Sequence, residues 1–180
     1  MKKLSTFIHK FSFKPQAGFT LIELLVVIGI LGVLAAALVA TIDPFEQLKK
    51  ANDANVKNTA VEFINANIRY YTTHNHMPWA DNCLGAGVTA PSSSPLYPNM
   101  TTCLQTLALD GEIKGAFTTV TSVLSSIIIT GDDTSVTACF LPQSKAQRAD
   151  ANTKWDNTGS TTLATNLCGP TSTLCYWCSQ

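Results

Sequence analysis

Acidic side chains are absent from the first 22 residues of the chain, and Glu23 is the only ionisable residue between Phe19 and Ile42. This apolar run of 24 residues is about the length that an α-helix needs to cross a bilayer core of roughly 30 Å. A single carboxylate inside such a run costs about 2.5 to 3.5 kcal/mol on insertion scales. Glu23 is therefore expected to have a partner or a task.

Patterns that usually carry catalysis are also lacking. The chain has no serine-histidine-acid order, no glycine-rich phosphate loop and no recognisable pair of buried carboxylates. We therefore expect no enzyme activity and no cofactor. His74 and His76 have no third ligand nearby in the sequence, and we assign them no metal site.

The segment before the apolar run is basic. Residues 1–18 hold four lysines and no acid, so the positive-inside rule predicts that this end stays in the cytoplasm. The residues at the junction read Lys14-Pro15-Gln16-Ala17-Gly18, followed by Phe19-Thr20-Leu21-Ile22-Glu23. A short basic leader ending in glycine, then phenylalanine and a threonine-leucine-isoleucine-glutamate run, resembles the type IV pilin-like family, which includes type IV pilins, competence pilins and type II secretion pseudopilins.

This resemblance implies a maturation pathway. A prepilin peptidase would cut between Gly18 and Phe19, the new amino terminus would be methylated, and Glu23 would meet the amine of a neighbouring subunit during polymerisation. Glu23 could equally pair with the amine of its own chain. The implied partners are identical or related pilin subunits, the peptidase, an inner-membrane assembly platform and the lipid bilayer.

Two other interpretations fit the apolar run less well. A secretory signal peptide would have a shorter apolar region with its cleavage site on the far side. An ordinary single-span anchor accounts for the length and the basic flank, but gives no reason for Glu23.

Removal of the leader would leave 8 basic against 12 acidic residues, a net charge of −4. We expect an α+β fold in which a long N-terminal helix packs on a small, disulfide-stapled antiparallel sheet. Asp43-Pro44 predicts a kink or break within that helix. The expected parts are a leader (1–18), a membrane and polymerisation helix (19–42), its amphipathic continuation (43–72) and a globular extracytoplasmic head (73–180).

Within the head, a short helix is expected over 100–109, and a long loop over 143–166. Gly131-Asp132-Asp133 predicts a hairpin turn. Strands are expected at 116–123, 126–130, 135–141 and 173–178.

Six cysteines outside the membrane predict disulfides rather than a metal site. The preferred pairs are Cys83 with Cys103, and Cys139 with one of Cys168, Cys175 or Cys178, the other two pairing together. A zinc knuckle and a Cys175–Cys178 redox pair remain as alternatives.

Other candidate sites are weaker. Asp132 and Asp133 could help to bind calcium, although solvated turn residues are the commoner case. Lys145, Arg148 and Lys154 could hold phosphate, but the negative mature charge does not indicate nucleic acid as a partner.

The leading functional hypothesis is a structural subunit of a pilus-like filament serving adhesion, motility, DNA uptake or secretion. A minor pilin-like tip module and a membrane-anchored thiol protein are the alternatives. The subunit is expected to be a single-pass inner-membrane protein before assembly, and part of a surface or periplasmic filament afterwards.

Overall fold

The computed structural model describes residues 18–41, 43–164 and 166–179, and residues 1–17 of the expected leader lie outside them. The chain divides into two compact units between Asp43 and Pro44. The first unit contains helix α1, Leu21–Thr41. The second unit contains all the other elements.

Helix α2, Pro44–His74, opens the second unit. Proline suits the first helical position because the N–H that it lacks would have no acceptor there. Asp43 is not helical, so the expected long helix is interrupted there, where Asp43-Pro44 predicts a break. At the other end, Asn75 adopts φ +60° and its N–H donates to the Tyr71 carbonyl at 2.8 Å, which ends the helix in a left-handed cap.

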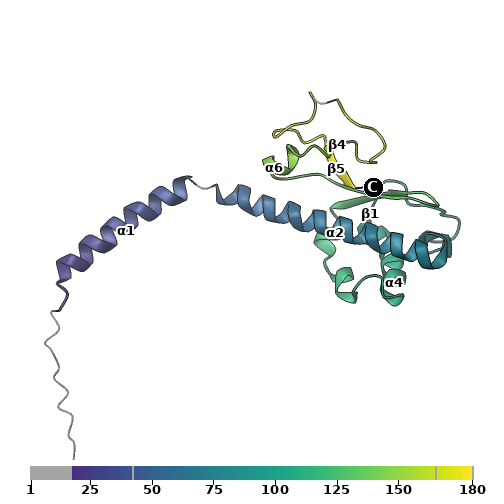
Figure 1. The fold of residues 1–180 in the computed structure, drawn as a ribbon, viewed down its shortest axis with the longest axis horizontal. Coiled ribbons are helices and arrows are strands. Elements are labelled where there is room, and N and C mark those ends of the chain that lie inside the picture. Colours follow the sequence, from purple (N-terminus) through teal and green to yellow (C-terminus); the bar gives the residue numbers. More distant parts are fainter. Residues whose placement is uncertain (1–17, 42, 165, 180) are drawn as a thin grey trace, which may run out of the picture. The chain divides into compact units, whose positions relative to one another are not determined.

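A five-stranded antiparallel sheet lies beside α2, with strand order β1-β2-β3-β5-β4 (Figure 1). Its strands are β1 (Ser94–Pro95), β2 (Ile127–Gly131), β3 (Val136–Phe140), β4 (Thr153–Trp155) and β5 (Tyr176–Ser179). The remaining short helices are η1 (Pro78–Asp81), α3 (Leu96–Asn99), α4 (Thr101–Leu109), η2 (Gly115–Thr119), α5 (Thr121–Leu124) and α6 (Lys145–Arg148). The expected α+β, disulfide-stapled fold class is confirmed.

The hydrophobic core lies between α2 and one face of the sheet. Strand alternation places Ile129 and Ala138 opposite each other on this face, and Phe140 opposite Trp177. Phe63 and Tyr70 of α2, with exposed fractions of 0% and 2%, cover it. Helices α4 and α5 add Leu104, Leu107 and Leu124 to the same core.

The strand expected at 116–123 is wrong, because the chain forms η2 and α5 there. The hydroxyl groups of Thr118 and Thr119 donate to carbonyls three residues earlier, at 2.8 and 2.7 Å, and so support helical turns. Helical turns also bury both Phe117 and Leu124.

The long loop expected at 143–166 is also partly wrong, because it contains α6 and β4. Ser144 caps α6 by accepting a hydrogen bond from the Gln147 N–H at 3.2 Å. The Thr153 hydroxyl donates to the Gln147 carbonyl at 2.6 Å, which holds β4 against α6. Strand β5 begins only at Tyr176, because the preceding residues belong to the loop closed by the Cys168–Cys175 disulfide.

Candidate functional site

Helix α1 is exposed along its whole described length. Its segment Leu21–Val39 is long and apolar enough to cross a membrane, and none of it is buried within the chain. Apolar surface of this extent is covered in a stable state by lipid or by other apolar helices. By length and composition, this helix suits a membrane or a bundle of apolar helices.

Glu23 closes a capping box with Thr20 at the start of this helix. One oxygen of the Glu23 carboxylate accepts from the Thr20 N–H at 2.9 Å and from the Thr20 hydroxyl at 2.8 Å. In return, the Glu23 N–H donates to the Thr20 hydroxyl oxygen at 3.3 Å. The carboxylate thus satisfies a helix-end N–H that apolar surroundings would leave unpaired.

Thr20 is a site residue that the sequence analysis missed. The Thr-x-x-Glu spacing before an apolar run is itself the signal that could have revealed it. In the full-length chain, the Phe19 nitrogen belongs to a peptide bond, so an amine for Glu23 exists only after cleavage. The two expected roles of Glu23 therefore concern the processed subunit.

Gly18 and Phe19 precede α1 and are both exposed. A Cβ atom placed on Gly18 would meet no heavy atom within 4 Å. Packing among the described residues therefore does not require a glycine there. A requirement for glycine at this position would have to come from a partner that binds the junction.

The six cysteines form three disulfides: Cys83–Cys103, Cys139–Cys178 and Cys168–Cys175. The structure contains the first preferred pair and selects Cys178 as the partner of Cys139. Cys175 and Cys178 belong to different disulfides, which contradicts the redox-pair alternative. Because every cysteine is paired, none is left as a zinc ligand.

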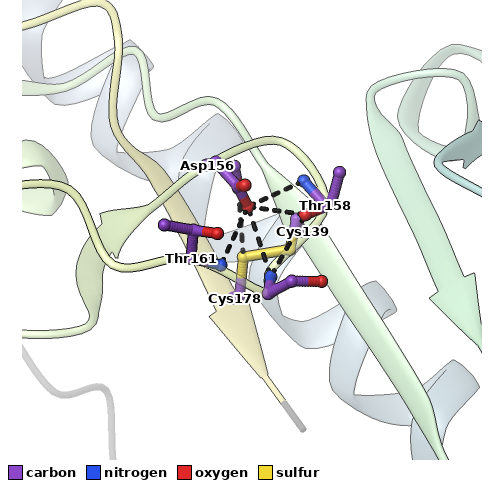
Figure 2. Close-up of a disulfide and its surroundings, with 6 residues drawn as sticks. Cys139, Asp156, Thr158, Thr161 and Cys178 are labelled. Carbon is purple, nitrogen blue, oxygen red and sulfur yellow. Dashed lines mark hydrogen bonds between the residues drawn. A yellow bond between two sulfur atoms is a disulfide. The ribbon is translucent and has the colours of Figure 1, made fainter.

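The Cys139–Cys178 disulfide joins neighbouring strands on the sheet face opposite the core, and a loop covers it (Figure 2). The Asp156 carboxylate holds this loop by accepting from the Thr158 hydroxyl at 2.8 Å and from the N–H groups of Thr158, Ser160 and Thr161. Burial acts to raise the pKa of Asp156, but these hydrogen bonds outweigh it and lower the pKa.

Gly159 allows the loop to lie directly on the disulfide. It adopts φ +71° and is buried. A Cβ atom here would lie 2.5 Å from the Thr137 methyl carbon and 2.9 Å from the Cys139 sulfur. Any side chain at this position would push the loop away from the sheet.

The calcium candidates lie in the turn between β2 and β3. The Asp132 carboxylate accepts hydrogen bonds from both the N–H and the hydroxyl of Thr134 and of Ser135, at 2.7 to 3.1 Å. These bonds lower the pKa of Asp132 to about 2. Both oxygens of Asp132 are thus used by its own turn, and Asp133 is exposed. Within the described residues, no group of three or more His, Cys, Asp or Glu side chains is placed to hold a metal.

His74 and His76 sit beside acids at the end of α2. The Nε2 atom of His74 lies 3.6 Å from the Asp110 carboxylate, and the Nδ1 atom of His76 lies 3.8 Å from Asp81. The Tyr70 hydroxyl donates to Asp81 at 2.5 Å, and burial together with Asp81 raises the pKa of Tyr70. This cluster joins α2, η1 and α4.

Lys145, Arg148 and Lys154 come together around α6 and β4. Arg148 and Lys154 line a surface hollow of about 310 Å³ with the Cys168–Cys175 loop. The Arg148 Nε donates to the Pro142 carbonyl at 2.9 Å, and the Lys154 ammonium lies 5.7 Å from the centre of the Trp155 ring. Arg148 and Lys154, which are apart in sequence, therefore border one hollow.

Comparison with protein families finds the prokaryotic N-terminal methylation motif over residues 13–39. The chain carries the N-terminal motif of type IV pilin-like proteins. This match contains the pilin-like junction Gly18-Phe19, the Thr20–Glu23 capping box and most of α1. Neither the comparison with curated proteins nor that with solved structures gives a match.

Proposed function

We propose that this pilin-like chain is a structural subunit of a type IV pilus-like filament. The observation that carries the proposal is the combination of the methylation motif with a fully exposed apolar helix whose single acid lies at its first turn. In this proposal a prepilin peptidase cuts before Phe19, and the subunits polymerise through α1.

The position of Glu23 supports polymerisation over simple anchoring. Cleavage would convert the Phe19 nitrogen into a cation four residues before Glu23. A neighbouring subunit's amine would compete with Thr20 for the Glu23 carboxylate, and the charged pair would replace two hydrogen bonds inside one chain. Two opposite charges that are costly to leave alone in an apolar bundle would neutralise each other only when subunits meet.

The character of the head supports placement outside the cytoplasm. Three disulfides hold a domain of modest size, which is typical of oxidising compartments. The proposal therefore places the basic N-terminus in the cytoplasm and the head across the inner membrane, with the head later displayed on a filament. A structural rather than catalytic role follows from this assignment.

The proposal is tested in cells that express the chain as the only subunit. Intact-mass analysis tests the processing, and shearing of the cells tests fibre formation. The expected result is a subunit that begins at a methylated Phe19, recovered in fibres from the sheared fraction. A subunit that keeps residues 1–18, or that is cut elsewhere, would contradict the proposed processing. A correctly cut subunit that never leaves the membrane fraction would contradict the filament.

A further inference from the structure

The charges of the head are separated toward the two ends of α2. Helix α6 and strand β4 lie beside the first half of α2, and α4 lies beside its last part (Figure 1). The first region, here called the basic end, contains six cationic residues: Lys49, Lys50, Lys57, Lys145, Arg148 and Lys154. The second region, here called the acidic end, contains Asp81, Asp110, Glu112, Asp132 and Asp133, with Arg69 and Lys114 as its cations.

Five acids accompany these cations: Asp43, which directly precedes α2, and four that the fold holds in place. Asp53 is buried and accepts from the N–H groups of Gln143 and Ser144 at 2.7 to 3.1 Å. Glu46 accepts from the Lys145 N–H, and Asp150 pairs with Lys57 at 3.5 Å. The fourth acid, Asp156, is held by the loop over the disulfide.

The cations at this end point outward instead. Lys49, Lys50, Lys145 and Lys154 are exposed. Arg148 and Lys154 border the hollow of about 310 Å³, together with Asp150, whose charge is paired with Lys57. The basic end therefore presents positive charge to a partner.

The β2–β3 turn at the acidic end carries the opposite charge and is exposed. Residues 132–135 are all exposed, and the Trp79 indole N–H supports the turn by donating to the Asp132 carbonyl at 3.0 Å. The hydrogen bonds that lower the pKa of Asp132 to about 2 keep its charge present at neutral and mildly acidic pH. Asp133 follows it as a second exposed acid.

The two ends cannot neutralise each other within one chain. Glu46, beside Lys145, and His74, beside Asp110, are separated by most of α2, which corresponds to roughly 40 Å of helix. This distance is several times the Debye length of about 8 Å at physiological ionic strength. A second copy of the chain can supply the missing partner.

We infer that the basic end of one copy binds the β2–β3 turn of the next copy, with Asp133 placed at the hollow lined by Arg148 and Lys154. Contact between unlike ends is heterologous, and heterologous contacts repeat in one direction to give an open helical polymer when the rotation does not close into a ring. The contact rests on the proposed filament function and assigns to the heads a share in its assembly.

Charge exchange between the two ends tests this contact. Lys154→Glu and Asp133→Lys each turn an attraction into a repulsion at every contact along the fibre, and we expect each to lower the sheared-fibre yield about tenfold. The double variant restores the pair with its signs reversed, and its yield should return to within about threefold of the wild type. Lys114→Glu and Glu62→Lys are the matched controls, with the same charge changes at exposed positions outside the contact.

Each outcome bears on the inference. Normal fibre yield from both single variants would overturn the proposed contact. A double variant with a yield as low as the single variants would also overturn it. In both cases wild-type fibres would still support the filament function. Loss of fibre yield with Lys154→Glu but not with Asp133→Lys would also overturn the proposed contact. It would indicate that the hollow binds another partner, such as anionic lipid headgroups. Absence of wild-type fibres would contradict the filament function and this contact together. Unchanged disulfides and thermal midpoints show that each variant is folded.

Discussion

At the scale of single residues, Thr20 and Glu23 give the apolar helix a defined beginning. The capping box supplies acceptors for N–H groups that the helix cannot satisfy by itself. The Glu23 carboxylate is therefore already hydrogen-bonded within its own chain. If subunits assemble by pairing Glu23 with an amine, that ion pair would replace these hydrogen bonds.

The glycine before the junction gives the first prediction. Gly18→Val should leave the leader attached, because a peptidase pocket that accepts the helix start next to a glycine leaves little room for a branched side chain. Since no heavy atom lies within 4 Å of a Cβ atom at Gly18, the fold itself should be unaffected. Intact-mass analysis of the membrane fraction decides the matter, and normal cleavage of the variant would show that the junction is not read in this way.

The loop over the Cys139–Cys178 disulfide gives the second prediction. Gly159→Ala should lower the free energy of unfolding by about 1 to 3 kcal/mol, because it combines a left-handed φ with a clash against Thr137 and the disulfide. Denaturant unfolding of the full-length chain in detergent measures the change. Gly115→Ala is the control, since its Cβ atom meets nothing within 4 Å, and an equal loss in both variants would contradict the close packing at 159.

At the scale of elements, side chains of α2 hold the segment that follows β3. Asp53, only 3% exposed, accepts from two successive backbone N–H groups just before α6, and Glu46 accepts from the third. These bonds fix the path of a polar segment whose only buried side chains before β4 are Pro142 and Ser144. The basic surface on α6 depends on this attachment.

Removal of this attachment is the third prediction. Asp53→Ala should cost about 2 to 4 kcal/mol of unfolding free energy, because it leaves two backbone N–H groups without their acceptor in a largely buried place. The same denaturant measurement applies. Glu62→Ala removes an exposed acid from the same helix, and it should change stability by no more than about 0.5 kcal/mol. Equal effects of the two substitutions would show that Asp53 has no anchoring role.

The sequence predicted those elements that have strong periodicity or explicit end signals. The apolar run, the helix break at Asp43-Pro44, α4 and the β2–β3 hairpin belong to this group. It misassigned 116–123, because β-branched residues there favoured a strand while local hydroxyl bonds and the burial of Phe117 and Leu124 produced helical turns. It also missed β1 and β4, which consist of two and three residues and exist only through pairing with distant strands.

At the scale of the whole molecule, the two units have different kinds of surface. The first is an apolar helix that needs lipid or other helices around it, and the second is a disulfide-held head with a core of its own. A subunit of this kind can be stored in a membrane and then transferred to a bundle, because both surroundings cover the same apolar surface. In the proposed filament, the pairing of Glu23 would differ between these two states.

Fibre formation by Glu23→Ala, expressed as the only copy of the subunit, shows whether Glu23 directs polymerisation. The substitution removes a charge and should ease membrane insertion by about 2.5 to 3.5 kcal/mol, so an ordinary anchor would be unharmed. A filament subunit would instead leave each incoming amine without its partner, at a cost of roughly 3 to 5 kcal/mol per subunit. Thr20→Ala is the matched control, because it removes the hydroxyl half of the capping box and keeps the carboxylate. Both variants should be processed and membrane-resident, Thr20→Ala should form fibres, and Glu23→Ala should form few or none. Wild-type fibre yield from Glu23→Ala would contradict assembly through this carboxylate.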